Sequence, residues 1–267
     1  MKAAKALPIL MYHHVSPNPG LVTVSPENFR AQMRWLATHG WHTVGTKELE
    51  DFLAGRPLPA RSVMLTFDDG YLDNFVHAFP VLREYGLKAV IFVITGLIGD
   101  GEIRFEADCP DHRTCKGLIA AGRADEVMLR WSELAAMQES GHVEIHSHTH
   151  HHIRWDDAYA DEKVRLARLA EDLQESRRLI QTRLGHASAH LCWPWGYMGP
   201  GYEETAQACG FAYQYTVTRG TVMPATSPSA IPRIAVREAG AHWLARQCHT
   251  YASPLRARLY TLLRRIP

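Results

Sequence analysis

The sequence predicts a single α/β domain with a mainly parallel sheet. Short apolar runs alternate with longer segments of helical periodicity along the 267 residues. Such alternation is typical of parallel strands joined by crossover helices. No internal repeat or low-complexity linker divides the chain, so one domain over residues 1–267 is predicted. At this length a barrel-like α/β fold and an open sheet are both possible.

Five short apolar runs are predicted to be buried strands, because each is too short for a helix and is followed by polar or turn-forming residues. They cover residues 8–12, 62–67, 89–94, 143–145 and 191–193. Parallel α/β proteins place their functional groups at the carboxyl ends of the strands. The polar residues that follow these runs are therefore the candidates for a site.

Two helices between the strands have recognisable ends. Ser25 can cap a helix that has Pro26 at its first position and apolar residues at helical spacing on one face. Ser132 is predicted to open a second helix over residues 133–139, which Gly141 ends.

Three further segments differ in periodicity. Residues 157–184 are predicted to be one long charged helix, because leucine and isoleucine recur at helical spacing among Arg, Glu and Asp. Residues 99–130 have poor periodicity, which predicts a long loop insertion that shapes the substrate cleft. Residues 254–267 are predicted to be a basic C-terminal helix, either solvated or in peripheral contact with an anionic membrane.

Charge and cysteine content exclude several classes of protein. The balance of 29 Lys and Arg against 28 Asp and Glu argues against a dedicated nucleic-acid binder. The longest apolar run, residues 89–94, is too short for a transmembrane segment. No export signal is recognised, and the odd count of five cysteines favours reduced thiols. A cytoplasmic location is therefore expected; a Cys109–Cys115 pair and an exported or membrane-peripheral location are the alternatives.

An aspartate pair marks the end of the second predicted strand. The motif TFDDGY at residues 66–71 contains Asp68 and Asp69. Like charges this close repel each other unless a cation is present, so the pair indicates a metal site. A helix N-cap would explain one of the two aspartates but not both.

Histidines cluster at the end of another predicted strand, in the motif HSHTHHH at residues 146–152. His148 and His152 can converge on a helical turn or on a continuing strand, and so can His146 and His150 on a turn. Two histidines and one aspartate leave an open position for water in a tetrahedral metal site. This arrangement predicts hydrolysis of an ester, amide or related bond, and a metal-storage cluster is the alternative.

Two more motifs follow predicted strands. CWPWGY at residues 192–197 offers aromatic faces on which sugar rings can stack, or else it is core packing near a tight turn. The first strand ends in Tyr12, His13 and His14. An imidazole there could act as a general acid or base, or the motif is an ordinary polar strand end.

Together these residues resemble the polysaccharide deacetylases of carbohydrate esterase family 4. TFDDG at residues 66–70 is similar to the first motif of that family, and SHTHHH at residues 147–152 is similar to its Ser-His-Thr-x-x-His motif. WPWG at residues 193–196 resembles the third motif. The resemblance extends from about residue 7 to about residue 250, and it implies a distorted (β/α) barrel of about seven strands.

The resemblance also implies a role for each residue. Asp69, His148 and His152 would hold a divalent metal, most often zinc, and Asp68 would be the general base that deprotonates the attacking water. The metal and the backbone N–H of Trp195 would stabilise the oxyanion. The neighbouring motif residues Pro194 and Tyr71 are assigned to the same substrate and oxyanion set.

The sequence departs from the common family pattern in its third and later motifs. The Arg that usually precedes the motif-three proline is missing, and Trp195 stands where Tyr is usual. The late Leu-x-x-His motif that supplies the acid has no clear match, and His249 is its nearest substitute. LMYH at residues 10–13 looks like the permuted subgroup of bacterial poly-N-acetylglucosamine deacetylases, so His13 is preferred as the acid. Arg233, in a segment reminiscent of a late family motif, could replace the missing Arg in fixing Asp68.

The predicted function is metal-dependent removal of N-acetyl groups from an N-acetylglucosamine-type glycan or glycan precursor, with release of acetate. The enzyme class is that of hydrolases of non-peptide carbon–nitrogen bonds. One alternative is an O-acetyl ester or non-sugar amide hydrolase on the same fold. The other is an inactive carbohydrate- or metal-binding protein. The expected partner is a carbohydrate, with no nucleic acid, and a cytoplasmic location would favour a lipid-linked or nucleotide-linked precursor over finished polymer.

Overall fold

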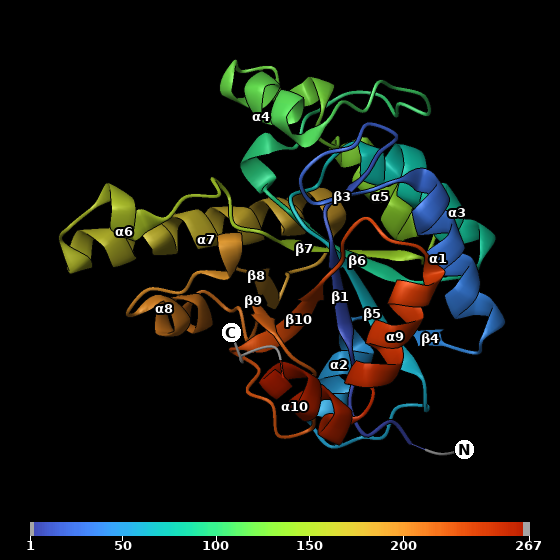
Figure 1. The fold of residues 1–267 in the computed structure, drawn as a ribbon. Coiled ribbons are helices and arrows are strands. Elements are labelled where there is room, and N and C mark those ends of the chain that lie inside the picture. Colours follow the sequence, from blue (N-terminus) through green and yellow to red (C-terminus); the bar gives the residue numbers. More distant parts are fainter. Residues whose placement is uncertain (1–2, 264–267) are drawn as a thin grey trace.

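The computed structural model describes residues 3–263 and forms a parallel β-barrel surrounded by helices (Figure 1). The barrel strands are β1 (Ile9–Tyr12), β5 (Ser62–Phe67), β6 (Ala89–Val93), β7 (Val143–Ser147), β8 (His190–Cys192), β9 (Tyr213–Arg219) and β10 (Ile231–Ala235). Each pairs in parallel with the next, and β10 pairs again with β1. The prediction of a distorted barrel of about seven strands is confirmed.

The ring is uneven, which explains why the barrel is distorted. Four residue pairs join β1 to β5, whereas the single pair Ser147 and Leu191 joins β7 to β8. The short strand β4 (His42–Thr43) pairs with the start of β5. β2 (His14–Val15) and β3 (Thr23–Val24) form a separate parallel pair beyond the end of β1.

Alternate residues of each strand point into and out of the barrel. In β5, Met64 belongs to an interior core with Ile9 and Phe92, whereas Leu65 belongs to the core outside the ring. The alternation continues past the end of β5. It therefore turns Asp68 inward, where it meets side chains of β8 and β10.

The helices form the outer layer of the barrel. They are α1 (Pro26–Thr38), α2 (Thr46–Leu53), α3 (Phe79–Glu84), α4 (His112–Ala120), α5 (Trp131–Glu139), α6 (Trp155–Ala158), α7 (Glu162–Leu184), α8 (Tyr202–Ala208), α9 (Ala241–Tyr251) and α10 (Pro254–Leu263). Four short turns accompany them: η1 (Asn74–Ala78), η2 (Thr95–Leu97), η3 (Ala124–Glu126) and η4 (Pro194–Gly196). Among the described residues, no helix is long and apolar enough to cross a bilayer.

Different helices cover different parts of the sheet. Phe29 of α1 and Leu134 of α5 pack in one outer core, to which α3 and α9 also contribute. Leu173 of α7 packs with Leu191 of β8 in a second outer core beneath α8. α2 closes the amino end of the barrel, because Phe52 lies in the interior core. The carboxyl end is left open beneath α4, at the top of Figure 1.

Two of the predicted helix boundaries are wrong. Ser132 does not cap α5, which begins at Trp131. Glu133 accepts the backbone N–H of Arg130, and the hydroxyl of Ser132 donates to a loop carbonyl instead. The helix predicted over residues 157–184 is two helices, α6 and α7, because Asp161 leaves the helical conformation and caps α7.

The two segments of weak periodicity contain more structure than the sequence indicates. Residues 99–130, predicted as a long loop, include α4 and the η3 turn. The predicted C-terminal helix corresponds to α10, and residues 264–267 lie outside the described part. Cys109 and Cys115 do not form the alternative disulfide, since both are free thiols.

Candidate active site

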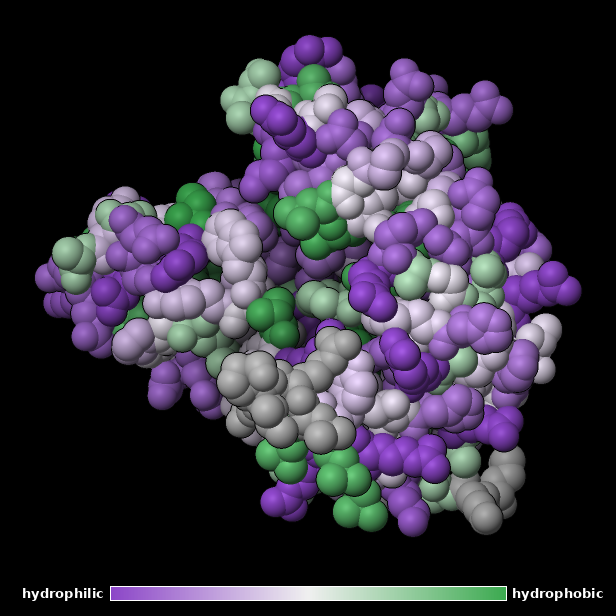
Figure 2. Space-filling view, viewed as in Figure 1, coloured by the Kyte–Doolittle hydropathy of each residue, from purple (hydrophilic) through white to green (hydrophobic). Residues whose placement is uncertain are grey.

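A cleft of about 530 Å³ opens at the carboxyl end of the barrel. Its polar wall comes from the residues that follow β1, β5, β7 and β8, and its opposite wall comes from α4 and the loop before β3. Figure 2 shows this face hollowed between the segment that carries α4 and the helices on the left. The position agrees with the general rule for parallel α/β folds.

Three metal-binding side chains converge in the cleft. Asp69 Oδ1 lies 3.3 Å from Nε2 of His148 and 3.6 Å from Nε2 of His152. Asp69 and His148 are buried, whereas His152 is partly exposed to the cleft. One oxygen and two imidazole nitrogens are a donor set that suits a divalent transition metal such as zinc.

The two imidazoles are oriented by their surroundings. The Nδ1–H of His148 donates to the carbonyl of Cys192 over 2.7 Å, which leaves Nε2 toward Asp69. A fixed second nitrogen is the usual arrangement of a metal-binding histidine. Burial and the neighbouring His148 lower the pKa of His152 to about 4, so its ring is neutral and offers a lone pair.

Asp69 is held in its ionised form. Burial alone would raise its pKa, but the hydrogen bond from His148 and the nearby imidazoles hold the pKa well below the usual range. A neutral carboxyl would be a poor metal ligand. The side chain is therefore ready to bind a cation across the pH range of most proteins.

Asp68 has a different environment from its neighbour. Both of its oxygens accept bonds of 2.7 Å from the guanidinium of Arg233 in β10. Burial would raise the pKa of Asp68, and the charge of Arg233 outweighs that effect and lowers it. Cys192 also lies within ligand distance of Asp68 and His148. The Asp69 cluster is the better metal site, because Arg233 already occupies both oxygens of Asp68.

His13 completes the polar group at the end of β1. Its Nε2 lies 4.0 Å from the nearer oxygen of Asp68. Burial lowers the pKa of His13, while the charges of Asp68 and Asp69 act in the opposite direction. His13 and Asp68 therefore face the same space, within reach of one small reacting group.

The backbone of the site is strained. Only six non-glycine residues among those described have positive φ, and four of them are Asp69 (75°), Thr149 (67°), His152 (54°) and Trp195 (54°). Each such residue costs on the order of 1–3 kcal/mol and persists only where surrounding contacts hold it. The concentration of strain at one end of the barrel is typical of a functional site.

The η4 turn brings an aromatic side chain to the cleft. Trp195 is half exposed, and its ring lies 4.4 Å from that of His152, measured between centroids. Gly196 is required next to it, since a Cβ there would lie 2.5 Å from the backbone nitrogen of Val217. Pro194, predicted as a substrate residue, does not line this cleft. It is buried at the first position of the turn, where its fixed φ suits the conformation.

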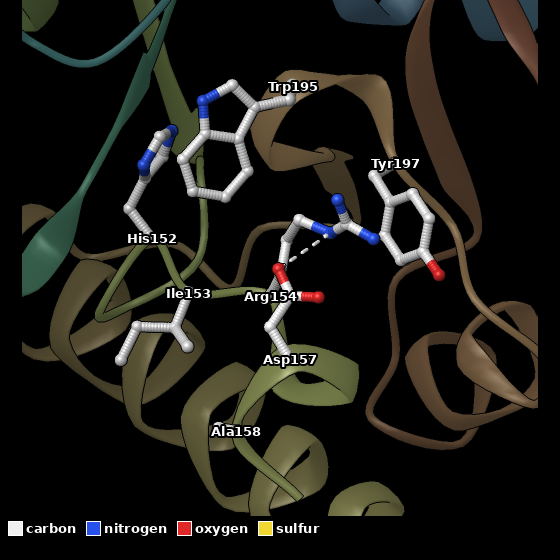
Figure 3. Close-up of a pocket in the computed structure, with 7 residues that line it drawn as sticks. All are labelled: His152, Ile153, Arg154, Asp157, Ala158, Trp195 and Tyr197. Carbon is white, nitrogen blue, oxygen red and sulfur yellow. Dashed lines mark ion pairs between the residues drawn. The ribbon is translucent and has the colours of Figure 1, made fainter. Parts of the chain in front are cut away.

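A second hollow of about 740 Å³ adjoins the cleft, and His152 and Trp195 line both (Figure 3). The guanidinium of Arg154 lies 3.8 Å from the ring centroid of Tyr197 and pairs with Asp157. Aromatic faces beside a charged pair are suited to the apolar faces and hydroxyls of sugar rings.

The remaining predicted residues fall in two places. Tyr71 lines the cleft, although only 4% of its surface is exposed, and its ring stacks on His14. His249 lies elsewhere, against Trp35 and Trp41 on the outer surface of α9. It is therefore no substitute for a general acid in the cleft.

Residues 99–130 do contribute to the cleft, as predicted, but sequence reasoning did not identify the side chains involved. His112 and Lys116 of α4 face Asp69 and His13 across it. No local pattern could have found them, because they lie in a segment with weak periodicity. The one available signal was the polar composition of residues 99–130.

Comparisons with known proteins agree with this geometry. A family model described as polysaccharide deacetylase matches residues 55–214, more than half of the chain. The poly-β-1,6-N-acetyl-D-glucosamine N-deacetylase of Staphylococcus aureus is 24% identical over 218 residues, which cover 81% of this chain and 68% of that protein. The Bacillus subtilis protein YxkH is 46% identical over 99 residues, but this stretch spans only 35% of its length.

Solved structures share the fold. IcaB from Ammonifex degensii superposes with a TM-score of 0.72 at 25% identity, covering 94% of this chain and 99% of that one. The Streptococcus pyogenes deacetylase PplD, solved in complex with acetate, has a TM-score of 0.74 at 21% identity and covers 92% of this chain and 99% of its own. At 21% identity, the similarity to PplD is evidence for the fold alone.

Proposed function

This chain belongs to the polysaccharide deacetylase family, and from that membership we propose that it removes N-acetyl groups from a glycan of N-acetylglucosamine and releases acetate. The family acts on carbon–nitrogen bonds, so the chain is a hydrolase. The observation that carries the proposal is the position of Asp68, fixed by Arg233, beside the cluster of Asp69, His148 and His152. The Staphylococcus aureus relative supports β-1,6-linked N-acetylglucosamine as the substrate.

We assign the metal to Asp69, His148 and His152, and we propose zinc as the ion. Two observations support the fit: the donor set of one carboxylate and two imidazoles, and the fixed Nδ1 of His148. Zinc accepts this mixture of nitrogen and oxygen ligands with an open fourth position. When bound, it would polarise the acetyl carbonyl and make water more acidic.

Two residues beside this cluster, Asp68 and His13, carry out the proton transfers. Asp68 takes a proton from the attacking water, since Arg233 keeps the carboxylate ionised and aimed at the cleft. His13, whose Nε2 lies 4.0 Å from Asp68, delivers a proton to the leaving nitrogen. The backbone N–H of Trp195, in the η4 turn, donates to the developing oxyanion.

The second hollow favours an oligomer over a single sugar. A ring whose acetamido group reaches Asp69 would leave its neighbour beside Trp195, where Arg154, Asp157 and Tyr197 line the wall (Figure 3). Each additional ring that finds such contacts adds binding free energy. We therefore expect kcat/KM to rise from the monomer to the tetramer of N-acetylglucosamine.

Acetate release tests the proposal. The protein is stripped of metal with a chelator, reloaded with Zn²⁺ and given β-1,6-linked N-acetylglucosamine tetramer, with an O-acetyl ester in parallel. Asp68→Asn should lower kcat by a factor of roughly 10²–10⁴, as expected for loss of a general base. His148→Ala should lose both zinc and activity.

If the wild type releases no more acetate from any N-acetylated glycan than these variants do, the function is not N-deacetylation. Cleavage of the ester alone would favour the O-acetyl hydrolase.

We propose that α10 contacts an anionic membrane surface peripherally. Leu255, Leu259 and Leu262 are more than half exposed, and Arg256 and Arg258 lie on the same short helix. In Figure 2, apolar atoms gather in the lower part of the molecule, where Figure 1 places α10. Exposed leucines with basic neighbours are typical of interfacial helices.

Vesicle sedimentation tests this contact. The wild type should sediment with phosphatidylglycerol vesicles, less so at high salt, and not with phosphatidylcholine vesicles. A variant that carries Leu255→Ser and Leu259→Ser should stay in solution. Equal sedimentation of wild type and variant would show that α10 does not make the membrane contact.

We propose a cytoplasmic location. All five cysteines are free thiols, which fits a reducing compartment. Cell fractionation decides between this location and an exported or membrane-peripheral one, because recovery outside the inner membrane would contradict the proposal.

A further inference from the structure

Three polar side chains form a hydrogen-bonded series that ends in the cleft. Asp73 Oδ2 lies 2.5 Å from Nδ1 of His14, and Nε2 of His14 lies 3.1 Å from Nδ1 of His112. None of the three belongs to the metal cluster or to the residues that move protons in the proposed reaction. The series joins β2, α4 and the residue that precedes η1, which are separate in the sequence.

The inner part of the series is rigid. His14 and Asp73 are buried, and the other oxygen of Asp73 accepts from the backbone N–H of Val15 and from the amide of Asn74. The ring of His14 stacks on Tyr71 with 3.8 Å between the centroids. A buried carboxylate with every contact satisfied fixes the groups bound to it.

The outer part of the series lies on the cleft wall. His112 is the first residue of α4, it is partly exposed, and Lys116 follows one helical turn later. Asp111 caps this helix by accepting the backbone N–H groups of Arg113 and Thr114. The contact with His14 and the capped helix α4 therefore fix the position of the His112 imidazole.

The carboxylate fixes the direction of the first bond. Asp73 can only accept, so Nδ1 of His14 donates to it. In the neutral tautomer of His14, Nε2 then keeps a lone pair. That lone pair accepts the Nδ1–H of His112. A neutral His112 then carries its own lone pair on Nε2, on the side of the ring away from His14. Burial lowers the pKa of His112, which favours a neutral ring.

We propose that Nε2 of His112 accepts a hydrogen bond from a hydroxyl group of the sugar ring that lies in the cleft, so that α4 carries a hydroxyl subsite. The proposal rests on the proposed function, because it presupposes a glycan in the cleft. Asp73 and His14 act as positioning residues, since they orient the imidazole and set which nitrogen is the acceptor. Lys116, on the same wall, supplies a donor for a second oxygen of the ring.

Binding and turnover are measured separately to test the subsite. Binding of the β-1,6-linked N-acetylglucosamine tetramer is measured by calorimetry in an Asp68→Asn background, which prevents turnover. There, His112→Ala should raise Kd about tenfold, the typical effect of one lost hydrogen bond in a buried site. His112→Asn keeps an acceptor oxygen and should recover part of the affinity. With Asp68 restored, His112→Ala should raise KM on the tetramer about tenfold and change kcat less than threefold.

Two further variants separate positioning from general damage. His14→Asn keeps a donor for Asp73 but is too short to reach His112, so it should raise Kd by less than His112→Ala. The two changes together should be no worse than His112→Ala alone, because they act on one bond. His77→Ala, on η1 and outside the cleft, is the matched control. Hydrolysis of 4-nitrophenyl acetate, which has no sugar, should be unchanged in His77→Ala.

The outcomes distinguish the two proposals. If the tetramer binds and Kd is the same for His112→Ala, the subsite is overturned while N-deacetylation stands. If the tetramer binds and His112→Ala weakens it but no acetate is released, the subsite stands and the proposed reaction fails. If no glycan binds to the wild type, both are wrong. A fall in kcat on both substrates with unchanged Kd would also contradict a binding role for His112.

Discussion

Arg233 and Asp68 form an ion pair between strands that are far apart in the sequence. Both side chains are buried, and the guanidinium donates two parallel bonds to the carboxylate. A buried carboxylate is costly unless it is paired with good geometry. The pair therefore keeps Asp68 ionised and also fixes its direction toward the cleft.

Replacing Arg233 should therefore damage both stability and chemistry. Arg233→Met leaves the Asp68 charge buried and unpaired, so the free energy of unfolding should fall by about 3–5 kcal/mol. Urea denaturation measures this change. Adding Asp68→Asn should recover part of it, because the unpaired charge is removed.

A surface pair gives the matched control for that substitution. Arg178 and Glu175 are both more than a third exposed, so Arg178→Met should cost less than about 1 kcal/mol. An Arg233→Met protein as stable as Arg178→Met would mean that the buried pair does not hold Asp68.

Single residues were predictable where a motif identifies them. The aspartate pair and the histidines of residues 146–152 stand at strand ends that are apolar enough to recognise, and the structure brings Asp69, His148 and His152 together. Arg233 was reached only through the resemblance, since nothing local shows that its side chain crosses the barrel. His112 could not be predicted from the sequence, because its hydrogen-bond partner His14 is 98 residues away along the chain.

At the scale of elements, prediction succeeded where burial is complete and failed where it is partial. β5 was predicted with its observed bounds because all six of its residues are buried and mostly apolar. β9 and β10 were missed. Each carries a buried polar residue, Gln214 in β9 and Arg233 in β10, and these interrupt the apolar run that marks a strand. The break between α6 and α7 was missed because the charged pattern continues through it.

The η4 turn supports a prediction about one glycine. In Gly196→Ala the new Cβ would collide with the backbone of Val217, so the turn must shift and move Trp195 with it. We expect kcat to fall at least tenfold, as a displaced oxyanion donor typically costs more than that. Zinc content should stay the same, because the proposed ligands follow β5 and β7.

Gly55→Ala is the control for backbone strain in this comparison. Gly55 also has positive φ, 86°, but a Cβ added there would meet no atom of the described residues within 4 Å beyond its chain neighbours. It should lose about 1–2 kcal/mol of stability and keep its activity. Equal activities for the two variants would show that the position of Trp195 does not matter.

At the scale of the whole molecule, the barrel holds two polar layers inside an apolar ring. The upper layer is the candidate active site. The lower layer lies deeper in the barrel, where the rings of His146 and His190 are 4.8 Å apart and bonds reach Glu144 and Glu50. The spacing of the sequence motifs predicted the residues of the upper layer. The lower layer depends on which residues of β7 and β8 face inward together, and this follows only from the closed barrel.

The lower layer makes stability depend on pH in a defined direction. Burial, together with the charge of His190, lowers the pKa of His146 to about 4, although Glu144 acts to raise it. In the unfolded chain the pKa returns to about 6.5. As the pH falls below 6.5, the unfolded state binds a proton that the folded state does not bind until about pH 4. The stabilisation by neutral His146 is therefore complete above pH 6.5 and is lost on the way down to pH 4, by up to about 3 kcal/mol.

Comparison with a His146→Gln variant isolates this contribution. Histidines outside the lower layer, His152 among them, titrate in the same range in both proteins and cancel in the difference. The pKa of Glu144 is lowered to about 2, so its own effect lies below pH 4.5 and outside the window of pH 4.5–6.5. Within that window the free energy of unfolding of the wild type should fall by up to about 1.4 kcal/mol more per pH unit than that of the variant.

Urea denaturation at steps of half a pH unit measures this slope. His39→Gln, at the exposed end of α1, should follow the wild type. Parallel slopes for wild type and His146→Gln would mean that His146 is protonated in the folded protein and that the lower layer is an ordinary ion-pair network.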